Sequence, residues 1–297
     1  MAEFEDRHWT SGDGLRLHYR DYSSAGAGPV DKAPVVCIPG LTRNARDFEA
    51  LAATLAPRRR VLCLDLRGRG DSAYAKDPAT YTPLTYAADL AALLEQAEIA
   101  RFVAIGTSLG GLVTMLYAAG HPDRLAGAVF NDVGPEVSGV GLARIGGYVG
   151  QGRSFETWMH AARALQESQG EMFPDFTIAD WLTLAKRAMT LGSNGRIVFD
   201  YDMKISEPLA STAPTSSGAA PPDLWPLWRA LAAAPVPLPV LVLRGALSDI
   251  LAPETAARMI AEVPDAELVT LDRLGHAPTL DEPEAVAAIE RLLDRAE

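Results

Sequence analysis

Residues 102–111 read Phe-Val-Ala-Ile-Gly-Thr-Ser-Leu-Gly-Gly, an apolar run that passes into a glycine-rich turn with Ser108 at its centre. Residues 112–119 continue with the apolar spacing of a helix. The segment from Gly106 to Gly110 therefore places a G-x-S-x-G pattern between a strand and a helix, which is typical of a nucleophilic serine. Glycines two positions to either side relieve crowding at so sharp a turn. We predict that Ser108 is a nucleophile on an α/β fold.

The same alternation of strand and helix extends to both sides of this stretch. Runs rich in Val, Ile and Leu predict strands that are covered on both faces, with right-handed crossovers between them. The predicted strands are residues 35–38, 61–64, 102–105, 125–130, 240–243 and 268–271, and the predicted helices are 45–55, 86–96, 109–119, 253–261 and 283–295. The first 22 residues predict a hairpin. The fold class is therefore α/β, a mostly parallel, twisted sheet with an N-terminal antiparallel hairpin and flanking helices.

Residues 135–235 interrupt this alternation. The segment contains helical patterns near residues 155–166 and 178–189, followed by a Ser/Ala/Pro-rich stretch, 211–222, that is too poor in apolar residues to pack. We predict a core domain formed by residues 1–134 and 236–297, with residues 135–235 as a mainly helical insertion that ends in a mobile loop.

A serine hydroxyl needs a base, and His276 is the predicted base. It follows the last predicted strand in Leu-Gly-His-Ala-Pro, whereas the other four histidines lie in the hairpin, behind the nucleophile's helix or in the insertion. Ligands of an open α/β sheet bind beyond the carboxyl ends of its strands, so this loop can face Ser108.

The base in turn needs an acid that fixes its tautomer. Asp249 follows the predicted strand 240–243 and gives the chain order serine, aspartate, histidine. Asp132, which follows Asn131 at the end of the predicted strand 125–130, is the alternative, since it also lies at the carboxyl edge. We predict Asp249 as the acid and Asp132 as a residue that supports the start of the insertion.

Acyl transfer also requires donors to an oxyanion. One is the N–H of the residue after the nucleophile, Leu109, and the second comes from the loop after the first parallel strand, where Gly40 permits close approach and Leu41 is the candidate. A further loop, residues 65–72, carries Arg67 and Arg69. We interpret it as a tight glycine turn whose charges pair with one another rather than as an anion site.

Composition narrows the classes of partner. The formal net charge of −11, without a basic stripe, argues against nucleic acid. The N-terminus lacks the features of a secretory signal, and no apolar run is long enough to span a bilayer, so a cytoplasmic protein without a membrane partner is expected. Cys37 and Cys63 are interpreted as free buried thiols. No metal or nucleotide motif is present, so no cofactor is predicted.

These features together resemble the α/β-hydrolase superfamily over about residues 5–134 and 236–296. The matching pieces are the loop at Gly40 and Leu41, the turn 65–72, the elbow 106–111, Asp249 and His276. The chain is similar to the lidded esterases, enol-lactonases and C–C bond hydrolases of that superfamily, and the resemblance implies that residues 135–235 form a lid (cap) over the pocket. It departs in having Pro39 before Gly40 where many relatives have histidine.

The resulting hypothesis is a serine carboxylesterase that cleaves a small ester through an acyl-enzyme. A lactonase or a diketone hydrolase with the same triad is the enzymatic alternative, and a non-enzymatic ligand receptor is the alternative of another class. Tyr148, Trp158 and Trp181 are candidates for an apolar substrate pocket, although they can equally be core of the lid. The sequence shows no cluster of basic residues that marks a carboxylate-bearing substrate, which favours neutral esters.

Overall fold

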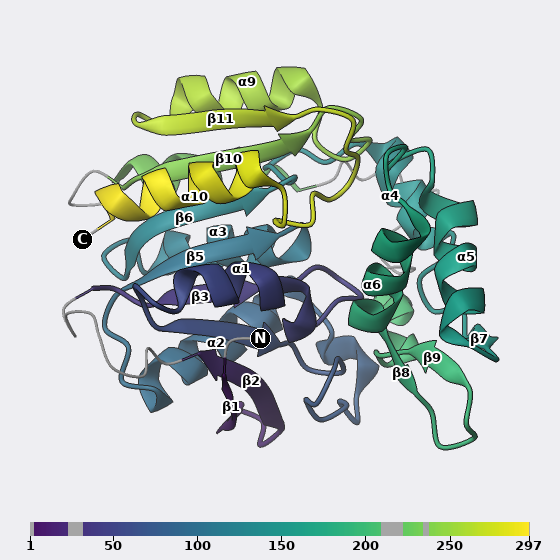
Figure 1. The fold of residues 1–297 in the computed structure, drawn as a ribbon. Coiled ribbons are helices and arrows are strands. Elements are labelled where there is room, and N and C mark those ends of the chain that lie inside the picture. The colour runs from purple at the N-terminus through teal and green to yellow at the C-terminus, as the bar shows by residue number, and fades with distance from the viewer. Residues whose placement is uncertain (1–2, 23–31, 209–221, 234–237, 297) are drawn as a thin grey trace.

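The computed structural model describes residues 3–22, 32–208, 222–233 and 238–296, and its centre is a sheet with helices on both faces (Figure 1). The predicted loop 211–222 lies, apart from Pro222, outside the described residues.

The central sheet has eight strands in the order β1-β2-β4-β3-β5-β6-β10-β11. The first two form the antiparallel hairpin and β2 pairs antiparallel with β4, while all remaining pairs are parallel. This confirms the predicted fold class, and all six predicted parallel strands are present. The strands are β1 (Glu5–Thr10), β2 (Arg16–Tyr22), β3 (Val35–Ile38), β4 (Val61–Asp65), β5 (Phe102–Thr107), β6 (Leu125–Asn131), β10 (Val240–Gly245) and β11 (Ala266–Leu271).

Two apolar cores sandwich the sheet because successive strand residues point to opposite faces. In β3, Val36 and Ile38 belong to one core and Val35 and Cys37 to the other. The first core is covered by α2 (Pro83–Gln96), α3 (Leu109–Gly120) and α9 (Pro253–Glu262), and the second by α1 (Glu49–Leu55) and α10 (Pro283–Arg295). Short 3-10 helices, η1 (Ala45–Phe48) and η2 (Pro78–Thr80), precede α1 and α2. Both cysteines are free and buried, as predicted, and face one another across β3 and β4.

Most of the segment between β6 and β10 gathers on the side to which the parallel strands point (Figure 1). Helices α5 and α6 correspond to the two predicted there, whereas α4 and a small three-stranded sheet in the order β7-β9-β8 were not predicted. The elements are α4 (Gly139–Gly146), β7 (Ser154–Phe155), α5 (Trp158–Gln169), α6 (Ile178–Ala188), β8 (Met189–Leu191), β9 (Ile197–Phe199) and η3 (Met203–Ile205).

The last part of the segment packs on the core instead. Helix α8 (Trp225–Ala230), which precedes η4 (Leu231–Ala233), contacts α3. Trp228 is fully buried against Phe130 of β6 and donates its indole N–H to the carbonyl of Met259 at 3.0 Å. Two of the four tryptophans in the predicted insertion therefore belong to the core of the central sheet.

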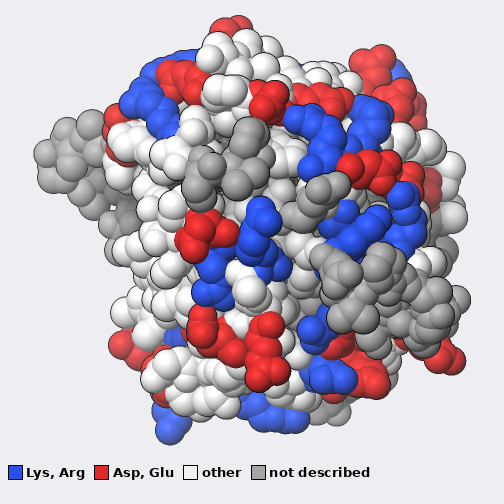
Figure 2. Space-filling view, turned by 90° about the vertical axis from the view of Figure 1, so that its left-hand side faces the viewer, with Lys and Arg blue, Asp and Glu red and all other residues white. Residues whose placement is uncertain are grey.

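The side of the molecule opposite α4, α5 and α6 is shown in Figure 2. It carries basic and acidic side chains interleaved with one another. Among the residues that the structure describes, none of the helices is long and apolar enough to cross a membrane.

Candidate active site

The turn between β5 and α3 holds Ser108 in a backbone conformation that few residues adopt. Its φ is +51° and its ψ is −114°. A Cβ on Gly106 would lie 2.5 Å from backbone atoms of Gly110, and a Cβ on Gly110 would overlap the carbonyl oxygen of Ile38. The two glycines are thus required by close backbone approach, which supports the reason given for the sequence pattern. The turn presents the hydroxyl at the carboxyl edge of the sheet, at the start of α3, where the helix dipole favours negative charge.

His276 reaches this hydroxyl from the loop between β11 and α10. Its Nε2 lies 2.9 Å from Ser108 Oγ, and its side chain is 8% exposed. The side-chain amide of Asn131, at the end of β6, donates to the carbonyl of Pro278 in the same loop at 2.9 Å. The backbone N–H of Ser108 donates to the carbonyl of Asn131 at 3.0 Å. Asn131 thus binds both the turn of Ser108 and the loop of His276, and so fixes the two catalytic candidates relative to one another.

The acid against this histidine is Asp132, and the prediction that Asp249 fills this position is wrong. His276 Nδ1 lies 2.8 Å from Asp132 Oδ2. The same oxygen accepts from the hydroxyl of Ser248 at 2.6 Å, and Oδ1 accepts from the backbone N–H of Gly245 at 3.0 Å. The carboxylate of Asp132 is fully buried, so these three donors compensate for the loss of water.

Strand order explains the difference between the two aspartates. Asp132 immediately follows β6, the neighbour of β5, and its φ of +56° turns the side chain at the strand end. Asp249 lies four residues beyond β10, one strand further from Ser108. It accepts two hydrogen bonds from Arg144 of α4, at 2.5 and 2.8 Å. These bonds hold the pKa of Asp249 below its usual value.

The two predicted donor positions flank Ser108. A Cβ on Gly40 would lie 3.7 Å from Ser108 Cβ, so the loop after β3 passes directly beside the nucleophile, and Leu41 follows. Leu109 is the first residue of α3, where backbone N–H groups have no partner within the helix. Both positions remain predicted oxyanion donors.

A cavity of about 180 Å³ opens onto Ser108 and His276. Its walls come from the loops at the sheet edge and from α4, α5, α6 and β9. Tyr148 lines it, as predicted. Trp158 and Trp181 are not among the lining residues: Trp181 is fully buried among Phe173 and Phe176, and Trp158 packs against that second core. These two aromatics match the alternative interpretation, in which they are core of the insertion.

Comparison with known proteins agrees with this geometry. The model of a family described as alpha/beta hydrolase matches residues 35–289. The chain belongs to the alpha/beta hydrolase family. A 3-hydroxybutyrate-oligomer hydrolase from Cupriavidus necator is 32% identical over 274 residues, 91% of each chain. The structure of an alpha/beta hydrolase from Novosphingobium aromaticivorans is 64% identical, with a TM-score of 0.91 over 99% of both chains. That of E-2-(acetamidomethylene)succinate hydrolase, 22% identical with a TM-score of 0.80 over 98% of this chain and all of the other, shares the fold.

In this alpha/beta hydrolase the turn 65–72 has a different role from the one predicted. Its arginines do not pair with the turn's own acidic residues. Arg67 donates hydrogen bonds to Asp89 and Asp13. Burial lowers the pKa of Arg67, but these two carboxylates together outweigh it, so the pKa is raised. Arg69 instead donates its Nε–H to the carbonyl of Leu41 at 2.9 Å. Arg69 is fully buried and also donates to the hydroxyl of Tyr86. The turn therefore braces the loop that carries a predicted oxyanion donor, in a chain with Pro39 before Gly40.

Three arginines line the cavity, although their positions in the sequence form no cluster. They are Arg43 from the loop after β3, Arg153 from the segment between α4 and β7, and Arg187 from α6. Only the folding of the inserted segment over the sheet edge brings them together. Sequence reasoning missed this set, since no local signal joins residues so far apart.

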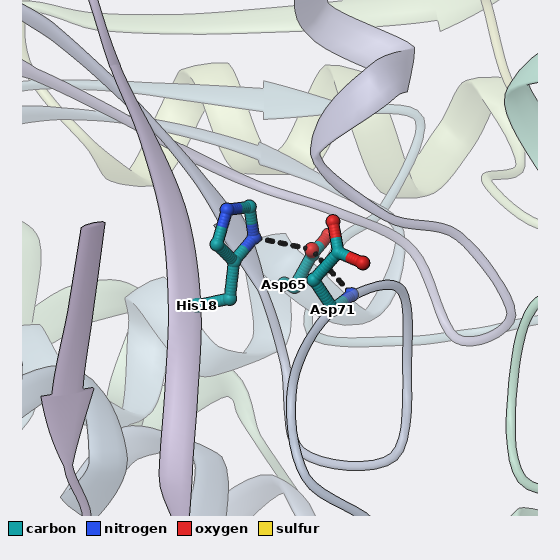
Figure 3. Close-up of side chains that lie close together, drawn as sticks. All are labelled: His18, Asp65 and Asp71. Carbon is teal, nitrogen blue, oxygen red and sulfur yellow. Dashed lines mark hydrogen bonds and ion pairs between the residues drawn. The ribbon is translucent and has the colours of Figure 1, made fainter. Parts of the chain in front are cut away.

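Within the described part of the chain, three side chains that do not line the cavity bring potential metal ligands close together. The ligand atoms of His18, Asp65 and Asp71 lie within 4.8 Å of one another (Figure 3). Asp65 Oδ2 is 2.7 Å from His18 Nδ1 and accepts the backbone N–H of Asp71 at 3.0 Å, while Oδ1 accepts the N–H of Ala45 at 2.7 Å. Both oxygens already bind nitrogen donors, so the group fits a hydrogen-bonded link between the hairpin, β4 and the turn 65–72.

Proposed function

We propose that the protein is a serine hydrolase that cleaves small carboxylic esters through an acyl-enzyme, with Ser108 as nucleophile, His276 as general base and Asp132 as the acid that orients it. The proposal rests on one observation, the chain of hydrogen bonds from Ser108 Oγ through His276 to Asp132 at 2.9 and 2.8 Å. This is the arrangement in which a weak hydroxyl nucleophile becomes reactive.

The steps follow from the positions of these groups. Ser108 Oγ bonds to the ester carbonyl carbon while its proton passes to His276 Nε2, and the buried carboxylate of Asp132 stabilises the imidazolium. Backbone N–H groups of Leu41 and Leu109 bind the oxyanion, each such donor being worth about 3 kcal/mol in the transition state. Collapse breaks the bond to the alcohol oxygen, which takes the proton from His276. Water then repeats the sequence on the acyl-serine and releases the acid.

The size and walls of the cavity favour a small substrate. At about 180 Å³ it is close in volume to a cavity that takes one benzene-sized molecule. We propose that residues 139–205 act as the lid that excludes water from the acyl-enzyme. The relative described as a 3-hydroxybutyrate-oligomer hydrolase makes short 3-hydroxybutyrate esters the first natural compounds to test.

The test is the initial rate of hydrolysis of p-nitrophenyl esters of increasing acyl length, with Ser108→Ala as the control. Turnover should fall towards the uncatalysed rate in the variant, by up to about 10⁶-fold. A fluorophosphonate should label the peptide that contains Ser108 in the wild type and leave the variant unlabelled. Full activity in Ser108→Ala would exclude the mechanism. Labelling without turnover of any ester would direct attention to lactones or diketones, and neither labelling nor turnover would favour a ligand receptor.

A further inference from the structure

The charged residues of the cavity wall differ in sign from the protein as a whole. The charged side chains of the wall are the three arginines and one aspartate, Asp47. Their formal charges sum to +2. The whole chain carries a net charge of −11. A cavity whose charge opposes that of the protein focuses the field and raises the local concentration of ligands of the other sign.

Two of these arginines already have carboxylate partners. Arg43 donates two hydrogen bonds to Asp47, at 2.7 and 2.5 Å. Arg187 lies 2.7 Å from Asp281, an acidic residue outside the cavity wall. Their charges are therefore largely offset within the protein, and both are explained by these pairs.

Arg153 differs from both. Within the described ranges, no carboxylate lies within ion-pair distance of its guanidinium, which rests over the ring of Phe155 at 5.5 Å from the centroid. The side chain is exposed, so Arg153 lies at the mouth of the cavity rather than at its floor. An unpaired guanidinium can bind a carboxylate through two parallel N–H···O bonds.

The backbone that carries Arg153 is fixed. Arg153 immediately precedes β7, and the two residues of that strand pair with Val198 and Ile197 of β9. The hydroxyl of Ser154 accepts the Nε–H of Arg196 at 2.8 Å. The ring of Phe155 lies beneath the guanidinium of Arg153, and Phe155 itself lines the cavity. The charge is thus presented from a strand end and over an aromatic ring, which limits the entropy lost on binding.

We infer that the ester substrate of this enzyme carries a carboxylate remote from the scissile bond, and that Arg153 binds this carboxylate at the mouth of the cavity. The inference rests on the proposed esterase function and deepens it. It reverses the expectation of a neutral ester that the sequence alone favoured. One guanidinium matches one carboxylate in charge and in planar geometry, and the small cavity leaves room for a short chain between that carboxylate and the reacting carbonyl.

The test compares two esters that differ in charge alone: monoethyl glutarate, which has a carboxylate at its far end, and the corresponding primary amide. The wild type should hydrolyse the carboxylate with a kcat/KM about tenfold or more above that of the amide, the effect of one charge-assisted hydrogen-bonded pair. Arg153→Gln should remove this preference by lowering the value for the carboxylate and leaving that for the amide unchanged. Arg163→Gln is the matched control, because Arg163 is exposed on α5 and is not among the residues that line the cavity.

Binding separates this inference from the esterase proposal. In Ser108→Ala protein, calorimetry should show tighter binding of monoethyl glutarate than of its amide, and the added Arg153→Gln change should abolish the difference. If the wild type hydrolyses neither ester but this binding preference is present, the esterase proposal fails for these compounds and the carboxylate site stands. Equal binding of the two compounds, or a preference that survives Arg153→Gln, would overturn the assignment of Arg153.

Discussion

Replacing Asp132 by asparagine removes one charge from the triad and keeps the shape of the side chain. Asp132 accepts three hydrogen bonds, one on Oδ1 from Gly245 and two on Oδ2 from Ser248 and His276. An asparagine has a single oxygen and therefore cannot serve both sides of the group. Either orientation places an NH₂ group against a donor in a fully buried site.

The expected loss follows from these two orientations. If the amide NH₂ faces His276, Nδ1 must accept a hydrogen bond, so the ring proton moves to Nε2 and the ring can no longer accept the proton of Ser108. If instead the oxygen faces His276, the NH₂ opposes the N–H of Gly245 and leaves buried donors unsatisfied, at about 1–3 kcal/mol for each. Neither orientation supplies the negative charge that stabilises the imidazolium. We expect kcat to fall by about 10⁴-fold, as in other triads, which corresponds to about 5 kcal/mol in the barrier.

Asp249→Asn is the matched comparison, because it makes the same chemical change at the residue that the sequence favoured. Asp249 binds Arg144 and not the histidine, so kcat should stay within about tenfold of the wild type, in the range of a partly exposed ion pair. Both variants are assayed on one p-nitrophenyl ester at saturation, with circular dichroism to confirm folding. The opposite result, an inactive Asp249→Asn and an active Asp132→Asn, would refute the reasoning, and so would full activity in both.

Three further outcomes are expected. Arg69→Lys should lower kcat about tenfold with little change in KM, because a lysine cannot bind the carbonyl of Leu41 and the other acceptors of Arg69 at the same time. An unchanged kcat would show that Arg69 does not position the loop at Leu41. Gly110→Ala should cost at least about 1–3 kcal/mol of unfolding free energy in urea, since its Cβ overlaps the carbonyl of Ile38, whereas Gly120→Ala, with open space in the same helix, should cost nothing. Burial lowers the pKa of His18, but the hydrogen bond to Asp65 and the carboxylate charges outweigh it, so the folded-state pKa lies above 6.5. The stabilising contribution of His18 is therefore complete below pH 6.5 and is lost as the pH rises through the folded-state pKa. The unfolding free energy of the wild type should fall more steeply between pH 6 and 8 than that of His18→Asn. Parallel plots of unfolding free energy against pH for the two proteins would contradict this.

Most of the fold could be predicted from local signals. Strands such as β5 and β10 are continuous apolar runs, and the glycines around Ser108 mark a turn that no other residue type fits. The elements that were missed are short or weakly patterned. Helix α4, Gly139–Gly146, has three glycines among its eight residues and buries only Gly141, so neither helix propensity nor periodicity reveals it.

The candidate site could be predicted where each residue has its own local signature. Ser108 has the elbow, and His276 follows the last strand as the only histidine in a loop at that edge. The two aspartates both follow strands and both satisfy the chain order. Two features of the folded chain distinguish them. Asp132 follows β6, the strand beside β5, and Asp249 is hydrogen-bonded to Arg144 of α4. Neither feature can be recognised before the strand order is known.

The charge of the cavity also could not be predicted from local sequence. Arg153 lies between Gly152 and Ser154 in a sequence with many arginines, and no motif in the sequence around it distinguishes it from Arg163, ten residues later. The difference is pairing and placement: Arg43 and Arg187 lie against Asp47 and Asp281, while Arg153 stands over Phe155 at the cavity mouth. A count of basic residues along the chain therefore predicts a neutral substrate, whereas a count of the charges that remain uncompensated around the nucleophile predicts an anionic one.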